Sequence, residues 1–502
     1  MGLMVFRILS DPETAMPSFK TSHGTIDVTN WGYQLQGING APLDPGSYAT
    51  STHDAVVIDY SSNGLDSGMH TAAQIDAIKN KPGGGVAIAY VSIGEASDFR
   101  DDWNPAWTTT GHATGALTAS APHWLGPVNP DWPEGRKVRY WESGWQNEIF
   151  NDQHDGALDK VVTQGFDAAY LDIVDAYYFW GAEATAAQRK PGDPLAGDER
   201  DAASRMIDFI VNMTAHARES NPDFFVILQN GDSIIDALAD LDPARKAALL
   251  DAIGGIAVED VYLRGGSAPE NNALKPDTYR IDILQRDFLG NGKAVFAVDY
   301  ATDPTKIGQF VERALSDGFI PTVAPDRDLD RPFAALQRPG TTTESDDLVA
   351  GTAATDTADG LGGNDWVYGF GGDDILSGGA GQDRLIGGTG KDVLTGGADA
   401  DWFIFQNVAE MRNGGLRDEI TDFQHGVDKI DLRAIDASTK AAGNQAFKWI
   451  GGQNFHRVAG EVHIKKSGAD FYVEGDVNGD GRADFKLMVD NIAILSKGDF
   501  IL

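Results

Sequence analysis

The sequence has no cysteine, no long hydrophobic run and few basic residues. Without cysteine it cannot form disulfides, thiolate nucleophiles or zinc–thiolate sites, although secreted proteins can do without disulfides, so the compartment stays open. No apolar run approaches the roughly 18 residues that a membrane-spanning helix needs. Against 75 Asp and Glu stand only 40 Lys and Arg, a net charge of −35. This charge disfavours nucleic acid and anionic lipid as partners and favours cations.

Several catalytic signatures are also missing. The chain has ten histidines but no HExxH, no GxSxG and no GxxxxGK[ST] motif, which disfavours zinc proteases, serine hydrolases and P-loop enzymes. The first residues, MGLMVFRILSDPETAMP, offer neither a continuous apolar region nor a small-residue cleavage site. We therefore expect no cleaved N-terminal signal peptide.

The composition changes near residues 332–347, which are polar, contain proline, glycine and threonine, and lack apolar periodicity. Such a segment is typical of an interdomain linker. It predicts an N-terminal extension over 1–24, a catalytic domain over 25–331 and a C-terminal domain over 348–502.

Before the linker, short β-branched runs alternate with helical stretches. The runs lie at 56–60, 85–94, 137–141, 168–174, 224–231, 253–262, 294–300 and 318–324. The segment 199–219 has amphipathic helical spacing, with Met206, Ile210 and Met213 on one face, and precedes Asn221-Pro222. Eight strands alternating with helices predict an α/β fold, a (β/α)8 TIM barrel.

Acidic residues gather at the carboxyl ends of these runs, where a barrel carries its reactive groups. They are Asp59, Glu95, Asp172, Asp175, Glu259, Asp260 and Asp299. One such acid is often only a helix cap or loop anchor, but seven on one rim favour a site. Paired carboxylates without cysteine or a metal cluster are typical of glycoside hydrolysis. Six of the eleven tryptophans fall within 101–150, where they either stack on sugar rings or pack a long loop.

Longer motifs carry a family resemblance over about 31–330. They include WGYQLQG at 31–37, YVSIGEA at 90–96, GFDAAYLDIVDAY at 165–177 and VEDVY at 258–262. The region resembles the glycoside hydrolases typified by endo-α-1,4-polygalactosaminidase. The resemblance implies that Asp172 is the nucleophile and Glu259 the general acid/base. Barrel strands four and six would carry them, at a separation of roughly 5–5.5 Å for a retaining enzyme, with a wider inverting gap left open.

The same resemblance implies a set of substrate-binding residues. These are Asp59, Tyr60, Glu95, Arg139, Trp141, Asp175, Tyr177, Asn230, Asp260, Tyr262, Asp299 and Tyr300. Their acids would bind hydroxyls or a protonated amino sugar, and no cofactor is expected to take part in catalysis.

After the linker the chain repeats every nine residues from Gly351 to Ile404, with the pattern GGxGxDxUx. The glycines allow tight turns, the aspartates present carboxylates and the apolar residue points inward, which predicts an all-β parallel β-roll. Carbonyls and carboxylates from stacked turns suit Ca²⁺, which prefers six to eight oxygens. The predicted ligands are Asp365, Asp374, Asp383, Asp392 and Asp401.

These repeats resemble the RTX family, and the following region resembles the C-terminal domain of serralysin-type secreted proteins. The segment DVNGDGRAD places Asp476, Asn478, Asp480 and Asp484 like the ligands of an EF-hand loop, but its twelfth position is Leu487. A further Ca²⁺ site and a simple Asx-rich turn therefore remain alternatives. The terminal DFIL is similar to the end that type I secretion machinery reads.

Together these features predict a secreted glycoside hydrolase that acts on a galactosamine-containing or related polysaccharide and carries structural Ca²⁺ in its β-roll. One alternative is a non-catalytic glycan-binding, matrix or adhesin protein. Another is an enzyme of the same fold that cuts a different glycan, because loops such as 101–137 and 181–200 set the substrate.

Overall fold

The computed structural model describes residues 17–37, 41–238, 241–265, 272–327, 329–330, 334–411 and 417–502. The chain divides into two compact units, one comprising Met1–Thr302 and Arg313–Phe333 and the other Asp303–Glu312 and Ala334–Leu502. We call them the barrel unit and the roll unit. Among the described residues, every helix is too short or too polar to cross a bilayer.

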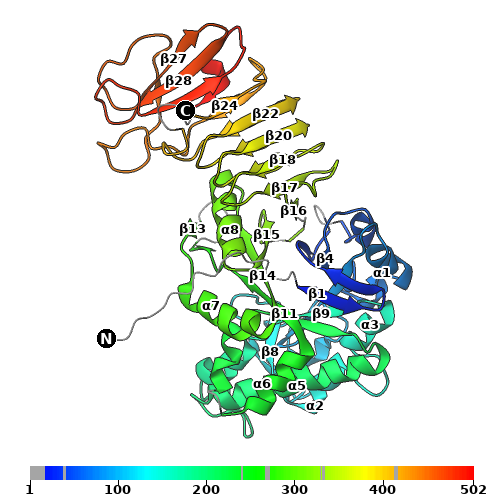
Figure 1. The fold of residues 1–502 in the computed structure, drawn as a ribbon. Coiled ribbons are helices and arrows are strands. Elements are labelled where there is room, and N and C mark those ends of the chain that lie inside the picture. Colours follow the sequence, from blue (N-terminus) through cyan, green and yellow to red (C-terminus); the bar gives the residue numbers. More distant parts are fainter. Residues whose placement is uncertain are drawn as a thin grey trace, which may run out of the picture. The chain divides into compact units, whose positions relative to one another are not determined.

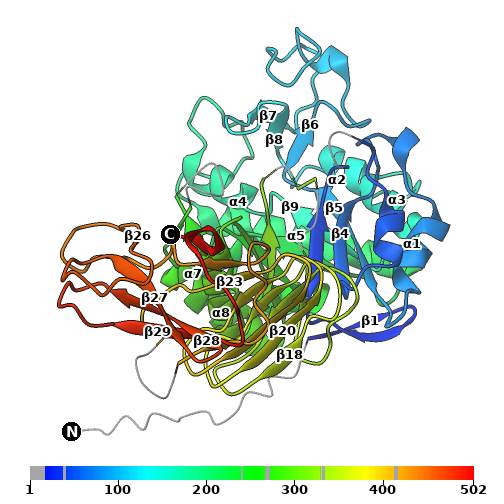
Figure 2. The same ribbon diagram turned by 90° about the horizontal axis from the view of Figure 1, so that it is seen from above.

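Eight parallel strands form a nearly closed (β/α)8 TIM barrel in the first unit (Figures 1 and 2). In chain order they are β3 (Trp31–Gln34), β4 (Ala55–Asp59), β5 (Val86–Ser92), β9 (Ala168–Asp172), β10 (Phe225–Gln229), β11 (Ile253–Glu259), β14 (Ala294–Tyr300) and β15 (Ile320–Ala324). Strands adjacent in this order pair in the sheet, and Trp31 Nε1 on the first strand donates to the Ile320 carbonyl on the last at 3.0 Å.

Helices connect the strands. They are α1 (Ala72–Lys79), α2 (Ser143–Ile149), α3 (Ala157–Gln164), α4 (Ala176–Tyr178), α5 (Glu199–Ser220), α6 (Pro243–Ala252), α7 (Thr278–Ile283) and α8 (Pro304–Ser316). The long helix α5 begins where the side chain of Asp198 accepts the Asp201 N–H, and it buries Met206, Ile210 and Met213 as the spacing predicts. A short hairpin of β12 (Leu263–Arg264) and β13 (Ala273–Leu274) follows β11.

Seven of the eight predicted barrel strands are present, but residues 137–141 are not one of them. Instead β8 (Gly135–Val138) joins β6 (Glu95–Ser97) and β7 (Leu125–Val128) in a small antiparallel sheet after β5, at one end of the barrel in Figure 2. The missing barrel strand is β3, whose sequence WGYQ contains no β-branched residue. The added strand, β3, comes first in the barrel, and the residues that are not a barrel strand, 137–141, come before β9. The two changes cancel in the count, so β9 and β11 remain strands four and six.

Alternation along the strands fills the barrel interior. The inward positions are Trp31, Tyr33, Ala55, Val57, Val86, Ile88, Ala168, Tyr170, Phe225, Ile227, Ala257, Phe296, Val298 and Ile320, with Phe19 joining the same cluster. Phe19 belongs to a hairpin of β1 (Ser18–Thr21) and β2 (Gly24–Asp27), and its ring stacks on Phe225 at 4.8 Å. Because Phe225 begins β10, the hairpin closes the amino-terminal end of the barrel. Part of the expected N-terminal extension is therefore barrel structure.

The roll unit contains two stacked sheets, and the strands from β17 to β25 alternate between them along the chain. The seven-stranded sheet comprises β16 (Ala335–Gln337), β17 (Asp347–Ala350), β19 (Trp366–Tyr368), β21 (Arg384–Ile386), β23 (Trp402–Ile404), β25 (Lys429–Asp431) and β30 (Phe500–Ile501). The eight-stranded sheet comprises β18 (Thr357–Asp359), β20 (Ile375–Ala380), β22 (Val393–Ala398), β24 (Glu419–Ile420), β29 (Phe485–Val489), β28 (Asp470–Asp476), β27 (Glu461–Ser467) and β26 (Lys448–Trp449).

This alternation follows from the nine-residue period. Thr357 pairs with Ile375 and Ile375 with Val393, so neighbours in one sheet are two repeats apart; β18, β20 and β22 lie side by side in Figure 1. The apolar residue of each repeat enters one core between the sheets: Val349, Ala358, Val367, Leu376, Leu385, Leu394 and Phe403. The first strand, β16, lies inside the predicted linker and pairs with β17, so the roll begins earlier than expected.

Candidate active site

Strand alternation places four carboxyl and amide side chains at the carboxyl end of the barrel interior. Each follows a buried inward residue by two positions. They are Asp59 after Val57, Asp172 after Tyr170, Gln229 after Ile227 and Glu259 after Ala257. Successive side chains of a strand point to opposite faces, so residues two apart share one. The polar end of the barrel interior thus holds three carboxyl groups and one amide.

Asp172 ends β9 and uses both carboxylate oxygens. The Tyr90 hydroxyl donates to its Oδ2, and the backbone N–H of Ile173 donates to its Oδ1 at 2.8 Å. Burial raises the pKa of Asp172 to about 6, although both hydrogen bonds oppose the rise. Tyr90 comes from the adjacent strand β5, so pairing within the sheet sets its position. The carboxyl group is fixed in orientation and ionised near neutral pH.

Glu259 ends β11 in a similar setting. The Tyr300 hydroxyl, from the adjacent strand β14, donates to its Oε1 at 2.9 Å. Burial raises the pKa of Glu259 to about 7, and the charge of Asp172 adds to the rise. Two carboxyl groups whose environments separate their pKa values are suited to act as base and acid. With pKa values near neutrality, one carboxyl group of this pair can be ionised while the other carries a proton.

Three left-handed residues follow the strands of this region. Ile173, Asn230 and Asp260 come directly after β9, β10 and β11, with φ of 58°, 53° and 54°. A β-branched residue such as Ile173 pays for this conformation, and such strain gathers at functional sites. Here it turns the Ile173 N–H onto Asp172. The strained turns therefore contribute to holding the site's geometry.

Arg280 on α7 joins two of these turns. Its guanidinium donates to Asn230 Oδ1 at 3.1 Å, to the Glu259 carbonyl at 3.0 Å and to Asp232 Oδ1 at 3.1 Å. Asn230 Oδ1 also accepts the Glu259 N–H at 3.2 Å. No sequence motif points to Arg280, because a helix residue some twenty positions after the strand can face in any direction. Its contacts fix the backbone that carries Glu259.

A cavity of about 570 Å³ opens beside Glu259. Its walls are Asp175, Tyr177, Tyr178, Glu199, Asn230, Gly231, Asp232, Ser233, Glu259, Asp260, Tyr279 and Arg280. Four of the predicted binding residues, Asp175, Tyr177, Asn230 and Asp260, thus lie together. Asp260 also accepts Arg327 at 2.7 and 2.8 Å, and the guanidinium stacks over Tyr300 at 4.3 Å. Acids dominate the wall, so the cavity favours a cationic or hydroxyl-rich ligand.

Three other predicted residues, Asp59, Tyr60 and Glu95, contact basic side chains. Asp59 accepts both Arg100 nitrogens, one of them at 3.0 Å, and the same guanidinium stacks over Tyr60 at 5.4 Å. Glu95 accepts Asn129 at 2.7 Å and lies 3.4 Å from Lys137, and burial raises its pKa. Each acid already has a cationic partner, which balances its charge at the rim.

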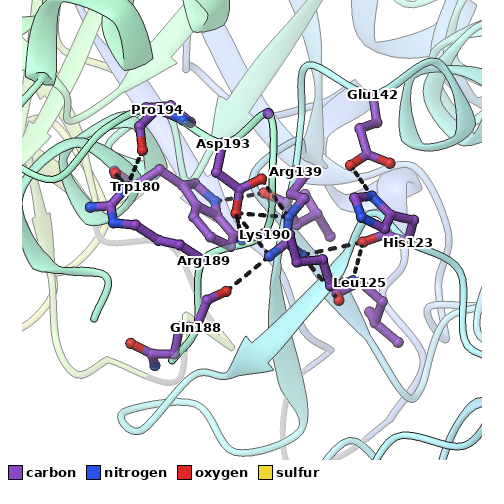
Figure 3. A network of polar contacts seen from close by, with 12 residues as sticks. His123, Leu125, Arg139, Glu142, Trp180, Gln188, Arg189, Lys190, Asp193 and Pro194 are labelled. Atoms are coloured by element: carbon purple, nitrogen blue, oxygen red, sulfur yellow. Dashed lines mark hydrogen bonds and ion pairs between the residues drawn. The ribbon is translucent and has the colours of Figure 1, made fainter. Parts of the chain in front are cut away.

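The structure places Arg139 and Tyr262 away from the cavity lining. Arg139 is 1% exposed, and its guanidinium donates to Asp193 at 2.8 Å and to the carbonyls of His123 and Gln188 at 3.2 and 3.0 Å (Figure 3). It ties the 181–200 loop to the 101–137 loop. The buried Tyr262 donates its hydroxyl to Asp317 at 2.8 Å. Both residues hold the surrounding structure with their polar atoms.

Asp299 and Tyr300 were expected to line the pocket together, but adjacent strand residues face opposite sides. Tyr300 points inward to Glu259, whereas Asp299 accepts the N–H groups of Tyr262 and Leu263 at 3.0 and 3.1 Å. Burial raises the pKa of Asp299 to about 8. Asp299 therefore anchors the turn after β11 and does not face the barrel interior.

The tryptophan-rich loop is mostly packed. Trp103, Trp107, Trp124 and Trp145 follow one another with ring centroids 5.5, 5.1 and 5.0 Å apart. Trp141 contacts Trp180 at 5.4 Å, and Arg205 lies over its ring at 5.2 Å. Trp132 is 57% exposed. The four tryptophans in contact with one another therefore pack the loop, as one of the two predictions for this cluster has it. Trp132 instead exposes its ring to solvent.

In the roll, each repeat aspartate from Asp365 to Asp401 is buried, with one oxygen hydrogen-bonded and the other unpartnered within the described residues. The N–H of Asp365 donates to Asp383 Oδ1 and that of Asp374 to Asp392 Oδ1, at 2.8 and 2.9 Å. The Oδ2 atoms that lack a hydrogen-bond partner belong to Asp365, Asp374, Asp383, Asp392, Asp401 and Asp418. Burial raises the pKa of Asp383 to about 6 and that of Asp365 to about 8.

The glycine turns enclose these oxygens. A Cβ on Gly378 would lie 2.3 Å from Asp383 Oδ2, and one on Gly381 would lie 1.8 Å from the Gly363 carbonyl oxygen. Carboxylate and carbonyl oxygens thus converge in gaps that admit no side chain. A hard cation with many oxygen ligands fits this donor set.

The 476–484 loop is different, because its side chains bind its own backbone. Asp476 accepts the N–H groups of Gly479 and Gly481, and Asp484 accepts those of Val477 and Asn478. This loop joins β28 to β29 as an Asx-rich hairpin turn. These bonds form the Asx-rich turn of one alternative, and the further Ca²⁺ site stays a prediction.

Comparison with known proteins finds a family model that matches each part of the chain. The sequence model of glycoside hydrolase family GH114 matches residues 12–339, and that of the peptidase M10 serralysin C terminus matches residues 365–502. An uncharacterized protein of Methanocaldococcus jannaschii is 33% identical over 309 residues, covering 60% of this chain and 77% of its own length. One from Thermotoga maritima is 32% identical over 303 residues, covering 59% and 80%.

Among solved structures, the glycoside hydrolase domain of PelA from Pseudomonas aeruginosa covers 61% of this chain and 97% of its own, with 15% identity and a TM-score of 0.41.

Proposed function

Because the chain belongs to glycoside hydrolase family GH114, we propose that Asp172 and Glu259 cleave a galactosamine-containing or related polysaccharide. The observation that carries this proposal is the pair itself. Both carboxyl groups are partly buried at the carboxyl end of the barrel, each receives a hydrogen bond from a tyrosine hydroxyl on a neighbouring strand, and their pKa values are raised to about 6 and 7.

In the proposed mechanism Asp172 attacks the anomeric carbon while Glu259 protonates the leaving oxygen. Glu259, now ionised, removes a proton from the water that hydrolyses the glycosyl–Asp172 ester, and the sugar is released with its configuration retained. Tyr90 holds Asp172 in line, and Tyr300 holds Glu259. The acidic wall with Asp175, Asp232 and Asp260 supports binding of a protonated amino sugar.

The test replaces each carboxyl group by its amide. Asp172→Asn and Glu259→Gln should each lower reducing-end release from galactosamine polymers by about a thousandfold or more, with unchanged circular dichroism. Asp27→Asn, an exposed acid at the opposite end of the barrel, is the control and should keep full activity. Near wild-type cleavage by either amide variant would remove that residue from the mechanism. Proton NMR of the first product anomer distinguishes retention from inversion.

Binding without cleavage is the outcome that would favour the alternative function. If the wild-type protein binds these polymers but releases no reducing ends from any of them, the barrel is a glycan-binding module. Cleavage of another glycan alone would keep the enzyme and change its substrate.

We also propose that the roll binds Ca²⁺ as an RTX domain and that the protein leaves the cell unfolded through type I secretion machinery. The unpartnered Oδ2 atoms and the glycine turns support the ion, and the serralysin-type match supports the route. The ligands would be Asp365, Asp374, Asp383, Asp392 and Asp401 with turn carbonyls. When bound, the ion neutralises these buried carboxylates, so its presence outside the cell would drive folding there.

Removing the residues after Ser496 tests the export proposal. In the folded protein Phe500 and Ile501 pair with β25, and Asp499 binds His425 and Gly426, so a terminal signal is accessible only before folding. The truncated protein should stay in the producing cell. Secretion of the truncation at the full-length level would reject this route.

A further inference from the structure

Two histidines that are distant in the sequence meet on one carboxylate outside the barrel. His154 Nδ1 lies 3.2 Å from Asp159 Oδ1, and His216 Nε2 lies 2.7 Å from the same oxygen. The three ligand atoms all lie within 4.8 Å of one another. His154 belongs to the turn before α3, Asp159 to the first turn of α3, and His216 to α5, which packs beside α3.

The two carboxylate oxygens of Asp159 have different hydrogen-bond partners. Its Oδ2 accepts the N–H groups of Asn151 and Gly156 at 3.1 and 3.2 Å, which caps α3 and orders the preceding turn. Its Oδ1 is left to the two histidines. The side chain is 4% exposed, so the backbone, and not solvent, sets its orientation. A ligand held in this way is preorganised.

Convergence of two imidazoles distinguishes this cluster from the other histidine–carboxylate contacts of the described chain. Each of those contacts has one histidine. The pairs are His112 with Asp98, His123 with Glu142, His425 with Asp499, His456 with Glu461 and His463 with Glu474. Ordinary pairing therefore accounts for five contacts of this protein but not for the doubled one.

The backbone at His154 adds an independent observation. His154 has φ of 55°, a left-handed conformation that costs a non-glycine residue free energy. In this conformation its ring stacks against His216, with centroids 5.2 Å apart and planes inclined by 30°. Half of the His154 side chain stays exposed, since 56% of it is accessible. The turn thus brings an imidazole over the carboxylate while leaving one side open to water.

We propose that His154, Asp159 and His216 bind a transition-metal ion of the zinc class. Two imidazole nitrogens and one carboxylate oxygen are the ligand set that Zn²⁺ accepts at three-ligand sites, with water in the fourth position. Nitrogen donors select such ions over Ca²⁺ and Mg²⁺, which prefer all-oxygen sites. The ion would link the 150–156 turn to α5 and stabilise the barrel there. This site is separate from the Asp172 and Glu259 pair and does not depend on the proposed function.

The experiment uses the full chain, freed of metal and returned to millimolar Ca²⁺ so that the roll is saturated. Isothermal titration with ZnCl2 should show one tight Zn²⁺ per chain, and Co²⁺ in its place should give the visible absorption of a tetrahedral ion. His154→Ala and His216→Ala should each weaken Zn²⁺ binding at least tenfold and abolish the cobalt band. His112→Ala, which removes an exposed histidine from a single-carboxylate pair, is the matched control and should bind as the wild type does.

Loss of folding is separable from loss of metal. His154 is on the surface, so its alanine variant tests the site even if His216→Ala unfolds. Equal Zn²⁺ affinity and an unchanged cobalt spectrum in His154→Ala would overturn the proposal, as would the absence of Zn²⁺ binding by the wild-type protein. In either case the two histidines only donate hydrogen bonds to Asp159.

Discussion

Both units of the protein bury carboxyl groups and raise their pKa values, but they surround these groups differently. In the barrel, Asp172 has a donor on each oxygen, and Tyr300 donates to Glu259. In the roll, Asp383 has a donor on Oδ1 only, and its Oδ2 faces a glycine turn. Burial raises the pKa of Asp172 and of Asp383 alike to about 6. A raised pKa alone therefore does not identify a catalytic group.

The two regions differ in the size of the ligand that the space beside their carboxyl groups admits. Glu259 of the barrel pair lines a cavity of about 570 Å³, large enough for a sugar unit. Tyrosine hydroxyls on neighbouring strands donate to both members of the pair. The roll repeats its carboxylate and its carbonyls along two sheets and leaves gaps that a Cβ would fill. The first arrangement suits a reaction, and the second suits a row of ions.

The largest expected effect comes from exchanging the same substitution between the two regions. Asp172→Asn should lower glycan cleavage by about a thousandfold or more and leave the calcium dependence of folding unchanged. Asp383→Asn should do the reverse, keeping kcat near the wild-type value while raising the Ca²⁺ concentration needed to fold the roll. Reducing-end assays and calcium titrations followed by circular dichroism measure both variants. Loss of activity in both, with Ca²⁺ saturating, would contradict this division of roles.

Chelation should have the next largest effect, and it should be confined to the roll. Without a cation, the buried Oδ2 atoms of five consecutive repeats have no partner, and burying unpaired polar groups costs free energy. Addition of a chelator should therefore expose sites after Ala334 to trypsin, while a fragment containing the barrel persists. Returning Ca²⁺ should restore protection. A roll that stays resistant to trypsin in chelator would show that it folds without the ion.

The roll was predictable from sequence and the barrel only in part, for physical reasons. A fixed period of nine sets strand pairing, core residues and carboxylate positions together, so Leu376 and Asp383 lie where the repeat predicts. Barrel strands have no common period. Runs of β-branched residues mark seven of the strands but not β3, where Trp31 and Tyr33 supply the buried bulk that valine or isoleucine supplies elsewhere.

The residues of the site also fall into a predictable and an unpredictable group. Strand ends and the two-residue period could locate Asp172, Glu259 and also Tyr90, which follows the inward residue Ile88 by two. The same period could have separated Tyr300 from Asp299. Arg280 reaches the site from a helix, whereas the Arg139 side chain points away from it and joins two loops. No local sequence pattern encodes the direction of such long side chains.

A smaller effect is expected from one methyl group in the roll. A Cβ on Gly378 would lie 2.3 Å from Asp383 Oδ2, whereas one on Gly452 would meet nothing closer than 4.0 Å. Gly378→Ala should therefore destabilise the calcium-loaded roll by about 1–3 kcal/mol, the usual cost of overpacking, and Gly452→Ala should be nearly neutral. Thermal unfolding in saturating Ca²⁺ compares the two. Equal melting temperatures would mean that the turn has room to relax.

The smallest expected effect concerns the pH profile. The pKa of Asp172 is about 6 and that of Glu259 about 7, so activity should fall below the first value as Asp172 takes up a proton. Activity should also fall above the second value as Glu259 loses its proton, giving a narrow optimum between the two.

The hydrogen bond from the Tyr90 hydroxyl lowers the pKa of Asp172, and the hydrogen bond from the Tyr300 hydroxyl lowers that of Glu259. Tyr90→Phe should therefore move the acid limb to higher pH, and Tyr300→Phe should move the alkaline limb to higher pH. Each shift should be about one unit, with up to about a tenfold loss of kcat, because a hydrogen bond to a charged carboxylate contributes about 1.5 kcal/mol at the low end and one pKa unit corresponds to about 1.4 kcal/mol. Profiles of kcat/KM for the two variants decide the assignment: if Tyr90→Phe moves only the alkaline limb, Asp172 and Glu259 have exchanged their roles.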